Sequence, residues 1–255
     1  MKKNLQHKNI KNKKSQCKIK SDEKKYLNIL YTNADSLSNK LNEIETHAAY
    51  YNADLILITE YLSKKPTSNF TNVFNIDGFN CLENNKGRGV CIYYKNNLEV
   101  SSHDHINKMF EPSMFINVKT TNKPLNLGLV YRSPNSEEIQ NTKLNKQLSF
   151  AFKKLKNLLV FGDFNHPSIE WEYNYCKKNE EHCDSKFLFE MTRLNINQLI
   201  NSTTHHKPKC KPTLIDLILT KQPEIISNIK HNPPLAKSHH QIITAQIVSN
   251  NRGGC

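Results

Sequence analysis

Residues 158–165 read Leu-Leu-Val-Phe-Gly-Asp-Phe-Asn. The four apolar residues predict a buried β-strand, which ends where the polar residues begin. Asp163 and Asn165 are two residues apart, so strand alternation places both side chains on one face. A carboxylate can take a proton from water or hold a metal ion, and an amide can donate to a phosphate oxygen. The stretch therefore predicts a strand end suited to phosphodiester hydrolysis, although Gly-Asp-x-Asn is also an ordinary strand-to-turn sequence.

The rest of the chain predicts an α/β fold. Residues 26–31 alternate like a strand, and apolar residues then recur at helical spacing over 37–51. Residues 53–60 form a nearly continuous apolar run, which is typical of a strand covered on both faces. Further strands are predicted at 89–94, 114–119, 125–131, 158–161, 214–219 and 242–248, and helices at 136–155 and 185–194. Many strands and few helices favour sheets packed face to face with helices outside.

The first 25 residues differ in composition from the rest. They contain ten lysines and two acidic residues, in a chain of formal net charge +13. Residues 1–25 therefore predict a basic, disordered arm that binds nucleic acid or directs nuclear import, or that only keeps the protein in solution. No Gly/Ser- or Pro-rich linker divides the remainder, so we expect one domain over 26–249 and a short tail over 250–255.

No membrane span or secretion signal is expected. No stretch approaches 18 apolar residues, and the lysine-rich start lacks the apolar segment of a signal peptide. The seven cysteines include no Cys-x-x-Cys pair, which favours a reduced compartment, nuclear or cytoplasmic, without disulfides. Two groups have zinc-binding residue types, but neither has the usual spacing of a structural site: Cys176 with His182 and Cys183, and His205 with His206 and Cys210.

Polar side chains gather where the predicted strands end. They are Asn33, Glu60, Tyr131, Arg132, Asp163, Asn165, Asp216, Ser238, His239 and His240. Each has an ordinary structural explanation, such as a turn residue, a solvated strand end or a surface imidazole. Ligands collect at the carboxyl ends of strands, however, and carboxylates there supply the hard oxygen ligands that Mg²⁺ prefers. A histidine would add a positive charge for phosphate.

In this order the residues resemble the endonuclease/exonuclease/phosphatase superfamily, and within it the apurinic-type endonuclease domains of non-LTR retrotransposons. The resemblance covers about residues 26–248. It rests on short motifs at residues 32–37, 57–60, 88–90, 130–134, 162–167, 214–220 and 238–240. It implies an α/β fold, a four-layer sandwich in which two mixed β-sheets pack face to face with helices outside.

The resemblance also implies roles for single residues in cutting phosphodiesters with a divalent metal, Mg²⁺ or Mn²⁺. Glu60 would be the main metal ligand with Asn33 beside it, and Asp163 would orient or deprotonate the attacking water. Asn165 and Tyr131 would hold the scissile phosphate, and Asp216 would support the site. Substrate would be bound by Arg132, Ser238 and His239. His240 would face the phosphate.

Two departures from the family pattern are visible. The family's Ser-Asp-His reads Ser238-His239-His240 here. The missing carboxylate would normally favour the charged imidazole, so we expect His240 to be less often protonated and the activity to be reduced. No clear equivalent of a Thr-Arg pair precedes the strand of Asp216, and Thr204-His205 is the nearest.

The leading hypothesis is a metal-dependent DNA endonuclease that nicks one strand of a target and leaves a 3′-OH for a reverse transcriptase. The priming step is implied by the resemblance alone. We expect a monomer that acts on DNA, with the reverse transcriptase domain absent from this chain, which would make it an isolated domain or a truncated element. The alternatives are a superfamily phosphatase acting on phosphoinositides or another phosphoester, and a catalytically inactive nucleic-acid-binding remnant.

Overall fold

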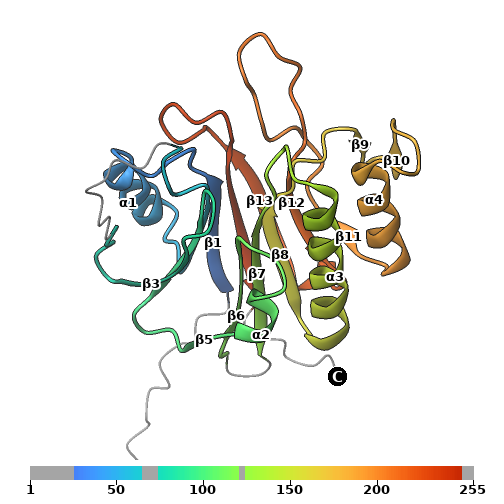
Figure 1. Cartoon of the computed structure of the whole chain (residues 1–255). Coiled ribbons are helices and arrows are strands. Elements are labelled where there is room, and N and C mark those ends of the chain that lie inside the picture. Colours follow the sequence, from blue (N-terminus) through green and yellow to red (C-terminus); the bar gives the residue numbers. More distant parts are fainter. Residues whose placement is uncertain (1–25, 65–73, 121–123, 249–255) are drawn as a thin grey trace, which may run out of the picture.

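The computed structural model describes residues 26–64, 74–120 and 124–248. Two six-stranded sheets pack face to face, and helices cover their outer faces (Figure 1). The predicted four-layer α/β sandwich with mixed sheets is therefore confirmed. The predicted arm over 1–25 and the tail over 250–255 lie outside the described residues. Within the described ranges, no helix has the length and apolar character needed to cross a bilayer.

Sheet A has the strand order β13-β14-β1-β2-β4-β3. Its central strands β1 (Tyr26–Asn33) and β2 (Leu55–Thr59) are parallel. A parallel pair needs a crossover connection, which α1 (Leu41–Tyr50) provides. The other strands pair antiparallel and are β3 (Phe79–Asn84), β4 (Val90–Lys95), β13 (Ile226–Asn232) and β14 (Ile242–Val248).

Sheet B repeats this plan in the order β11-β12-β8-β7-β6-β5. Its parallel pair is β7 (Leu125–Tyr131) and β8 (Leu158–Asp163), joined by α3 (Glu138–Lys154). The antiparallel strands are β5 (Val100–Ser102), β6 (Ser113–Val118), β11 (Asn197–Gln198) and β12 (Asp216–Thr220). The remaining elements are α2 (Asp104–Asn107), α4 (Cys183–Arg193), the hairpin β9 (Ile169–Glu170) and β10 (Tyr175–Cys176), and the 3-10 helix η1 (Pro223–Ile225).

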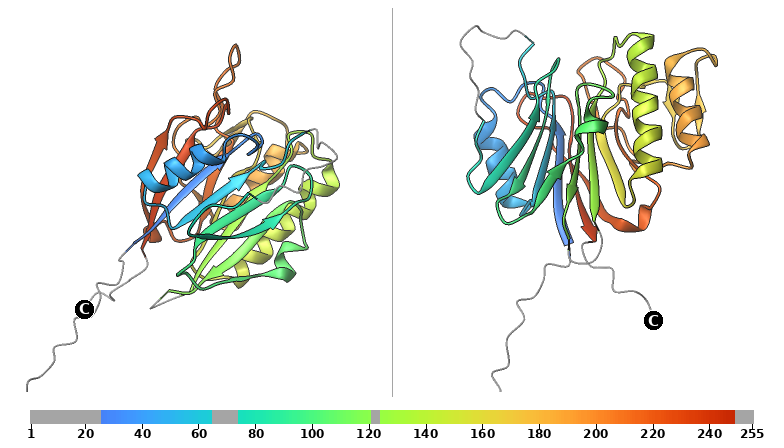
Figure 2. Two further views of the ribbon diagram at one scale, coloured as in Figure 1. Left: turned by 90° about the vertical axis from the view of Figure 1, so that its left-hand side faces the viewer. Right: turned by 60° about the horizontal axis from the view of Figure 1, so that its bottom comes forward.

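Three apolar layers hold the sandwich together. The central layer fills the space between the sheets, and an outer layer lies under the helices on each side. Helix α1 lies on one side of the molecule, and α3 and α4 lie on the other (Figure 2). In β2, Leu57 faces the central layer and Ile58 faces the α1 layer, and every residue of the strand is buried. The continuous apolar run thus has the predicted cause, a strand covered on both faces.

The predicted elements are present, and the strands of the two six-stranded sheets that were not predicted all lie at sheet edges. The predicted boundaries of 125–131 and 242–248 agree with β7 and β14, whereas the strand predicted at 214–219 begins at Asp216. The sequence did not predict β3 and β13. Both are edge strands with few buried residues, so they lack the apolar alternation on which the prediction depends.

Gly162, in the stretch 158–165, has a packing role that can be tested. A Cβ atom at Gly162 would lie 2.1 Å from the backbone oxygen of Val130 on β7. We expect Gly162→Ala to lower the free energy of unfolding by about 3 kcal/mol, because the two strands must separate. Gly78→Ala is the control, since no atom lies within 4 Å there and only the φ of 80° is unfavourable, at about 1 kcal/mol. If urea denaturation gave equal losses of unfolding free energy for Gly162→Ala and Gly78→Ala, this packing role of Gly162 would be contradicted.

Candidate active site

The strand registers bring the predicted residues to one edge of the sandwich. In sheet A, Asn33 pairs with Thr59, so β1 and β2 end together beside Glu60. In sheet B, Tyr131 pairs with Asp163 at the ends of the parallel strands. Asp216, the first residue of β12, lies directly opposite Asp163. Parallel pairs end at the same edge, and the edges of the two sheets meet here.

These polar residues continue the strand faces that fill the central apolar layer. Side chains two residues apart share a face, and Tyr31, Leu129 and Phe161 belong to the central layer. Asn33, Tyr131 and Asp163, two residues further on, therefore point into the same space between the sheets. The candidate site is the end of this layer, where apolar side chains give way to polar ones.

Asn33 bonds both sheets at this point. Its Nδ2 donates to Glu60 Oε1 at 3.1 Å and to Asp163 Oδ2 at 2.9 Å. Its Oδ1 accepts from the backbone N–H of Asp35 at 2.9 Å, which leaves both amide protons pointing at the carboxylates. The side chain is fully buried, so its orientation is fixed by these bonds.

Glu60 is held by Arg88, which lies in the motif at residues 88–90. Glu60 follows β2 with a φ of 51°, and its backbone N–H donates to Gly89 O at 3.0 Å. Arg88 Nη1 lies 2.8 Å from Glu60 Oε2, and Nη2 lies 2.9 Å from Asp35 Oδ1. A Cβ at residue 89 would lie 2.3 Å from the ring of Tyr61, so only glycine permits this approach. The Arg-Gly pair therefore places a cation beside the predicted metal ligand.

The second half of the site is a buried carboxylate and imidazole pair. His240 Nδ1 lies 2.8 Å from Asp216 Oδ2, and the Tyr31 hydroxyl donates to Asp216 Oδ1 at 2.7 Å. The other ring nitrogen, Nε2, lies 4.0 Å from Asp163 Oδ2. Tyr31 was missed by the sequence analysis, although its place two residues before Asn33 on β1 is a signal that it faces the site.

Burial and charge shift the pKa values in opposite directions within this group. Burial opposes the imidazolium, but Asp216 and then Asp163 and Glu60 outweigh it and raise the pKa of His240 to about 9. Burial, Asp216 and Glu60 raise the pKa of Asp163 well above its usual range. The pKa of Asp216 is lowered because His240 and Tyr31 offset the effect of its burial. At neutral pH His240 carries the positive charge, and Asp163 is the carboxylate that lacks full compensation.

The expectation that His240 lacks a carboxylate partner is wrong. Asp216 supplies the partner from the neighbouring strand, so replacement of the family's Asp by His239 does not make His240 less basic. The reason for expecting reduced activity is thereby removed. Thr204-His205 is the nearest equivalent of the missing Thr-Arg pair. The Thr204 hydroxyl oxygen accepts a hydrogen bond from the backbone N–H of Asp216 at 3.0 Å. The half-buried His239 accepts through its backbone oxygen from His206 N at 2.8 Å.

Tyr131 and Asn165 lie beside Asp163. Burial, followed by the charges of Glu60 and Asp163, raises the pKa of Tyr131, so its hydroxyl stays protonated and can donate. Asn165 has a φ of 50°, a conformation that asparagine tolerates. Its Nδ2 donates to Arg132 O at 2.8 Å, and its backbone N–H donates to Asp163 Oδ1 at 3.2 Å. An amide carries two protons, so one remains for a substrate oxygen.

Two residues predicted to bind substrate instead make bonds within the protein. Arg132 is 2% exposed and donates to Asn141 Oδ1 at 2.7 Å and to Asn165 O at 2.9 Å. Ser238 donates to Asn33 O at 2.8 Å and accepts from the backbone N–H of His240 at 3.2 Å. Arg132 and Ser238 therefore act as positioning residues and not as substrate-binding residues, because their polar atoms are bonded to the groups that they hold in place.

The acidic groups fit a divalent cation. Glu60, Asp163 and Asp216 are buried within one site, and atoms of Asp163, Asp216 and His240 lie within 4.8 Å of one another. Burial raises the pKa of Asp163, and the charges of Asp216 and Glu60 raise it further, so these carboxylates also repel one another. A hard cation would relieve that repulsion, and oxygen ligands are those that Mg²⁺ takes. Glu60 and Asp163 are the residues that could hold it. Asn33, predicted as a ligand, presents its Nδ2 protons to both carboxylates and so orients them instead of offering an oxygen.

A second polar cluster lies behind the site, under α4. His166 Nδ1 lies 2.9 Å from Asp184 Oδ1, and Cys183 Sγ lies 3.3 Å from the same oxygen. The ring of His166 stacks on Phe187 at 4.3 Å, and Arg132 donates to Cys183. The polar groups of this cluster are thus bonded to one another within the protein, so we interpret the cluster as structural. Neither zinc group considered from the sequence is brought together among the described residues.

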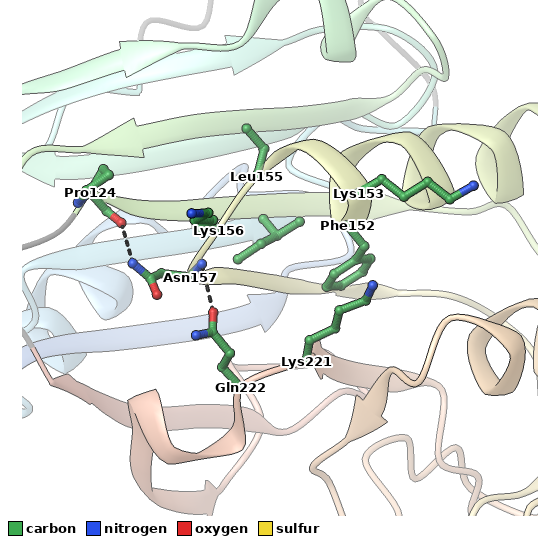
Figure 3. Close-up of a pocket in the computed structure, with 9 residues that line it drawn as sticks. Pro124, Phe152, Lys153, Leu155, Lys156, Asn157, Lys221 and Gln222 are labelled. Carbon is green, nitrogen blue, oxygen red and sulfur yellow. Dashed lines mark hydrogen bonds between the residues drawn. The ribbon is translucent and has the colours of Figure 1, made fainter.

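The cavity drawn in Figure 3 lies at the opposite end of sheet B. It measures about 550 Å³ and is lined by Phe152, Leu155, Asn157, Lys153 and Lys221, among others. Strand β8 begins at Leu158 beside this cavity and ends at Asp163 in the candidate site. A strand rises by about 3.3 Å per residue, so the two places are separated by the length of the strand. None of the predicted site residues lines this cavity.

Comparisons with known proteins agree with this geometry. A family model described as "Endonuclease-reverse transcriptase" matches residues 125–244. The endonuclease domain of TRAS1, a telomere-specific non-LTR retrotransposon, is similar with a TM-score of 0.68 and 15% identity, over 89% of this chain and 100% of that chain. Both matches agree with the resemblance to the endonuclease/exonuclease/phosphatase superfamily.

Other solved structures of this superfamily fold are similar to the chain. An AP endonuclease from Archaeoglobus fulgidus has a TM-score of 0.60 and 18% identity, over 87% of this chain and 99% of that chain. The 3′ phosphatase NExo from Neisseria, solved as a point variant bound to a product DNA hairpin, has a TM-score of 0.60 and 15% identity, over the same shares. No curated protein matches the sequence. At these identities the likeness concerns the fold.

The partnership of Asp216 with His240 predicts a measurable pKa change. In Asp216→Asn the largest stabilising charge is lost while burial remains, so the pKa of His240 should fall from about 9 to about 7 or below. NMR titration of the imidazole protons measures this change. Asp77→Asn, which alters an exposed carboxyl, should leave the pKa in place. A pKa that stays near its wild-type value in Asp216→Asn would contradict the assignment of the partner.

The buried His166 predicts how stability depends on pH. Burial lowers the pKa of His166 from 6.5 to about 4, so between these values the unfolded chain binds a proton that the folded protein does not. The contribution of neutral His166 to the free energy of unfolding is complete above pH 6.5. It is lost as the pH falls towards 4, and the total loss is about 3 kcal/mol. In His166→Asn, which can still donate to Asp184 but does not titrate, the decline measured by denaturant unfolding should be shallower. Identical pH profiles would rule out this contribution.

Proposed function

We propose that the chain is a divalent-metal-dependent endonuclease that nicks one strand of DNA. The observation that carries this proposal is the meeting of two groups at one sheet edge. Asn33 and Glu60 come from sheet A, and Asp163 and the Asp216–His240 pair face them. A metal ligand, a general base and a cation within one buried site are what phosphodiester hydrolysis requires.

Asp163 is the residue proposed to act on the attacking water. Its pKa is raised by burial and by Asp216 and Glu60, and a base whose pKa lies near the working pH is the most effective. Its Oδ2 accepts from Asn33 and its Oδ1 from the Asn165 backbone, so its orientation is fixed. Water held at this carboxylate can lose its proton as it attacks phosphorus.

The donors around Asp163 would bind the phosphate. His240 is positively charged at neutral pH and presents Nε2 on the side of Asp163. The Tyr131 hydroxyl remains protonated, and Asn165 has a free amide proton. These groups would stabilise the negative charge that develops on the phosphate oxygens. A metal ion held by Glu60 and Asp163, which Asn33 orients, would supply Lewis-acid stabilisation of the same charge.

A basic loop beside the site supports DNA as the substrate. The chain between β11 and β12 rises above the sheets as the orange loop of Figure 1 and carries the exposed residues Lys207, Lys209 and Lys211. Its base is fixed at the site, because His205 forms a β-bridge with His240. Lysines that flank a phosphodiester site attract a polyanion, and a duplex offers many phosphates beyond the one that is cut. A role in target-primed reverse transcription is part of the proposal and rests on the family resemblance.

The test is nicking of a supercoiled plasmid with Mg²⁺ and with EDTA. We expect cleavage only with the metal, and a loss of about 10²- to 10³-fold in rate for Glu60→Gln and Asp163→Asn, because each removes one charge-stabilising group. DNA binding, measured by fluorescence anisotropy, should persist in both variants. Glu99→Gln is the matched control, since its side chain is 73% exposed.

The other outcomes separate the alternatives. Near wild-type nicking by Glu60→Gln or Asp163→Asn would overturn the assignment of these residues. Release of phosphate from a soluble phosphomonoester without nicking would favour a phosphatase. Salt-sensitive DNA binding without turnover by the wild type would identify an inactive nucleic-acid-binding remnant.

A further inference from the structure

A groove of about 560 Å³ lies beside the candidate site and spans the seam between the two sheets. We call it the seam groove. Sheet A contributes Arg88 from the β3–β4 turn. The sheet B side contributes Phe110, Pro112, Tyr131 and, from the chain leading into α3, residues that include Glu137 and Gln140. Arg88 and Tyr131 line both the groove and the site. Whatever occupies the groove therefore adjoins the phosphate that the site would cut.

The walls of the seam groove are fixed by one hydrogen bond across the seam and by others within its sheet B side. Asn84 Nδ2, at the end of β3, donates to Ser113 O at 3.1 Å and joins the turn of sheet A to sheet B. Ser113 Oγ donates to Phe110 O at 2.6 Å, and the Tyr131 backbone N–H donates to Pro112 O at 3.2 Å. Preformed walls of this kind are typical of ligand sites.

The charge of the seam groove is unsuited to phosphate. Arg88 is the cation among its lining residues, and its guanidinium is paired with Glu60 and Asp35. Glu111 and Glu137 also line the groove, and both are exposed. These carboxylates would repel a phosphate. They would accept hydrogen bonds from an amino group, and Gln140 adds an amide that both donates and accepts.

A nucleobase combines the features that this lining would bind. It is uncharged and has an apolar face for the Phe110 and Pro112 side of the groove. Adenine, cytosine and guanine carry an exocyclic amino group, which can donate a hydrogen bond to a carboxylate. Thymine has no such amino group. The phosphate attached to such a base would lie towards Tyr131, on the site.

We infer that the seam groove receives the base of a nucleotide that flanks the scissile phosphate, and that Glu137 and Glu111 make it favour bases with an amino group over thymine. This inference rests on the proposed endonuclease function. It assigns the groove a role in choosing where a strand is cut, while the catalytic groups themselves read no sequence.

The experiment uses a linear duplex library of randomised sequence, cut by the full-length protein with Mg²⁺, whose nicked ends are sequenced. For the wild type we expect one position next to the nick to be depleted of thymine by about fivefold, which corresponds to one hydrogen bond of average net strength. Glu137→Gln, alone and combined with Glu111→Gln, should reduce this bias towards unity while nicking continues. The matched control is Glu138→Gln, because Glu138 is the next residue and pairs with Lys186 at 3.0 Å outside the groove.

The outcomes distinguish this inference from the proposed function. Nicking by the wild type with no bias at either flanking position, or with the same bias in the double variant, overturns the inference and leaves the endonuclease intact. A loss of bias in Glu138→Gln equal to that in Glu137→Gln overturns it too, since the effect would then be a general one of charge. Absence of nicking by the wild type overturns the endonuclease function and the inference with it.

Discussion

Two carboxylates that face each other inside the protein set the main constraint on this structure. Asp163 and Asp216 pair across β8 and β12, and neither is more than 1% exposed. Like charges so placed are costly unless other groups compensate for them. The imidazolium of His240, the hydroxyl of Tyr31 and the amide of Asn33 supply that compensation. They come from sheet A or from the segment leading into β14, so the two sheets must dock for the carboxylates to be buried.

The sequence predicted most of the fold because its strongest patterns lie in the central strands. The runs at 53–60 and 125–131 are buried on both faces, and such runs are distinctive. The edge strands β3 and β13 escaped prediction because their exposed residues have no apolar alternation. The helix boundaries were approximate, as with α3, which begins at Glu138 where 136 was predicted. Strand order across the sheets is set by pairings distant in sequence, which a local pattern does not contain.

The site was predicted less completely than the fold. Residue types at strand ends brought Asn33, Glu60, Asp163 and His240 into view, since these positions follow from local pattern and resemblance. The partner of His240 could not be read from its neighbours in sequence, because Asp216 reaches it from another strand. Arg132 looked available for substrate until its burial and its bond to Asn141 were known. Direction and burial of a side chain, which decide its role, come from tertiary packing.

The apolar layer between the sheets also sets the distance between the two halves of the candidate site. Glu60 belongs to one sheet and Asp163 to the other, and the strands that carry them, β2 and β8, face each other across this layer. Side chains such as Leu57 and Leu127 therefore fix how far apart the two halves of the site are held. A displacement of about 1 Å can cost about 10²-fold in rate. In the proposed endonuclease, apolar side chains that do not contact substrate would therefore affect the rate. A substitution within this layer would change turnover even though the strand-end residues are unchanged.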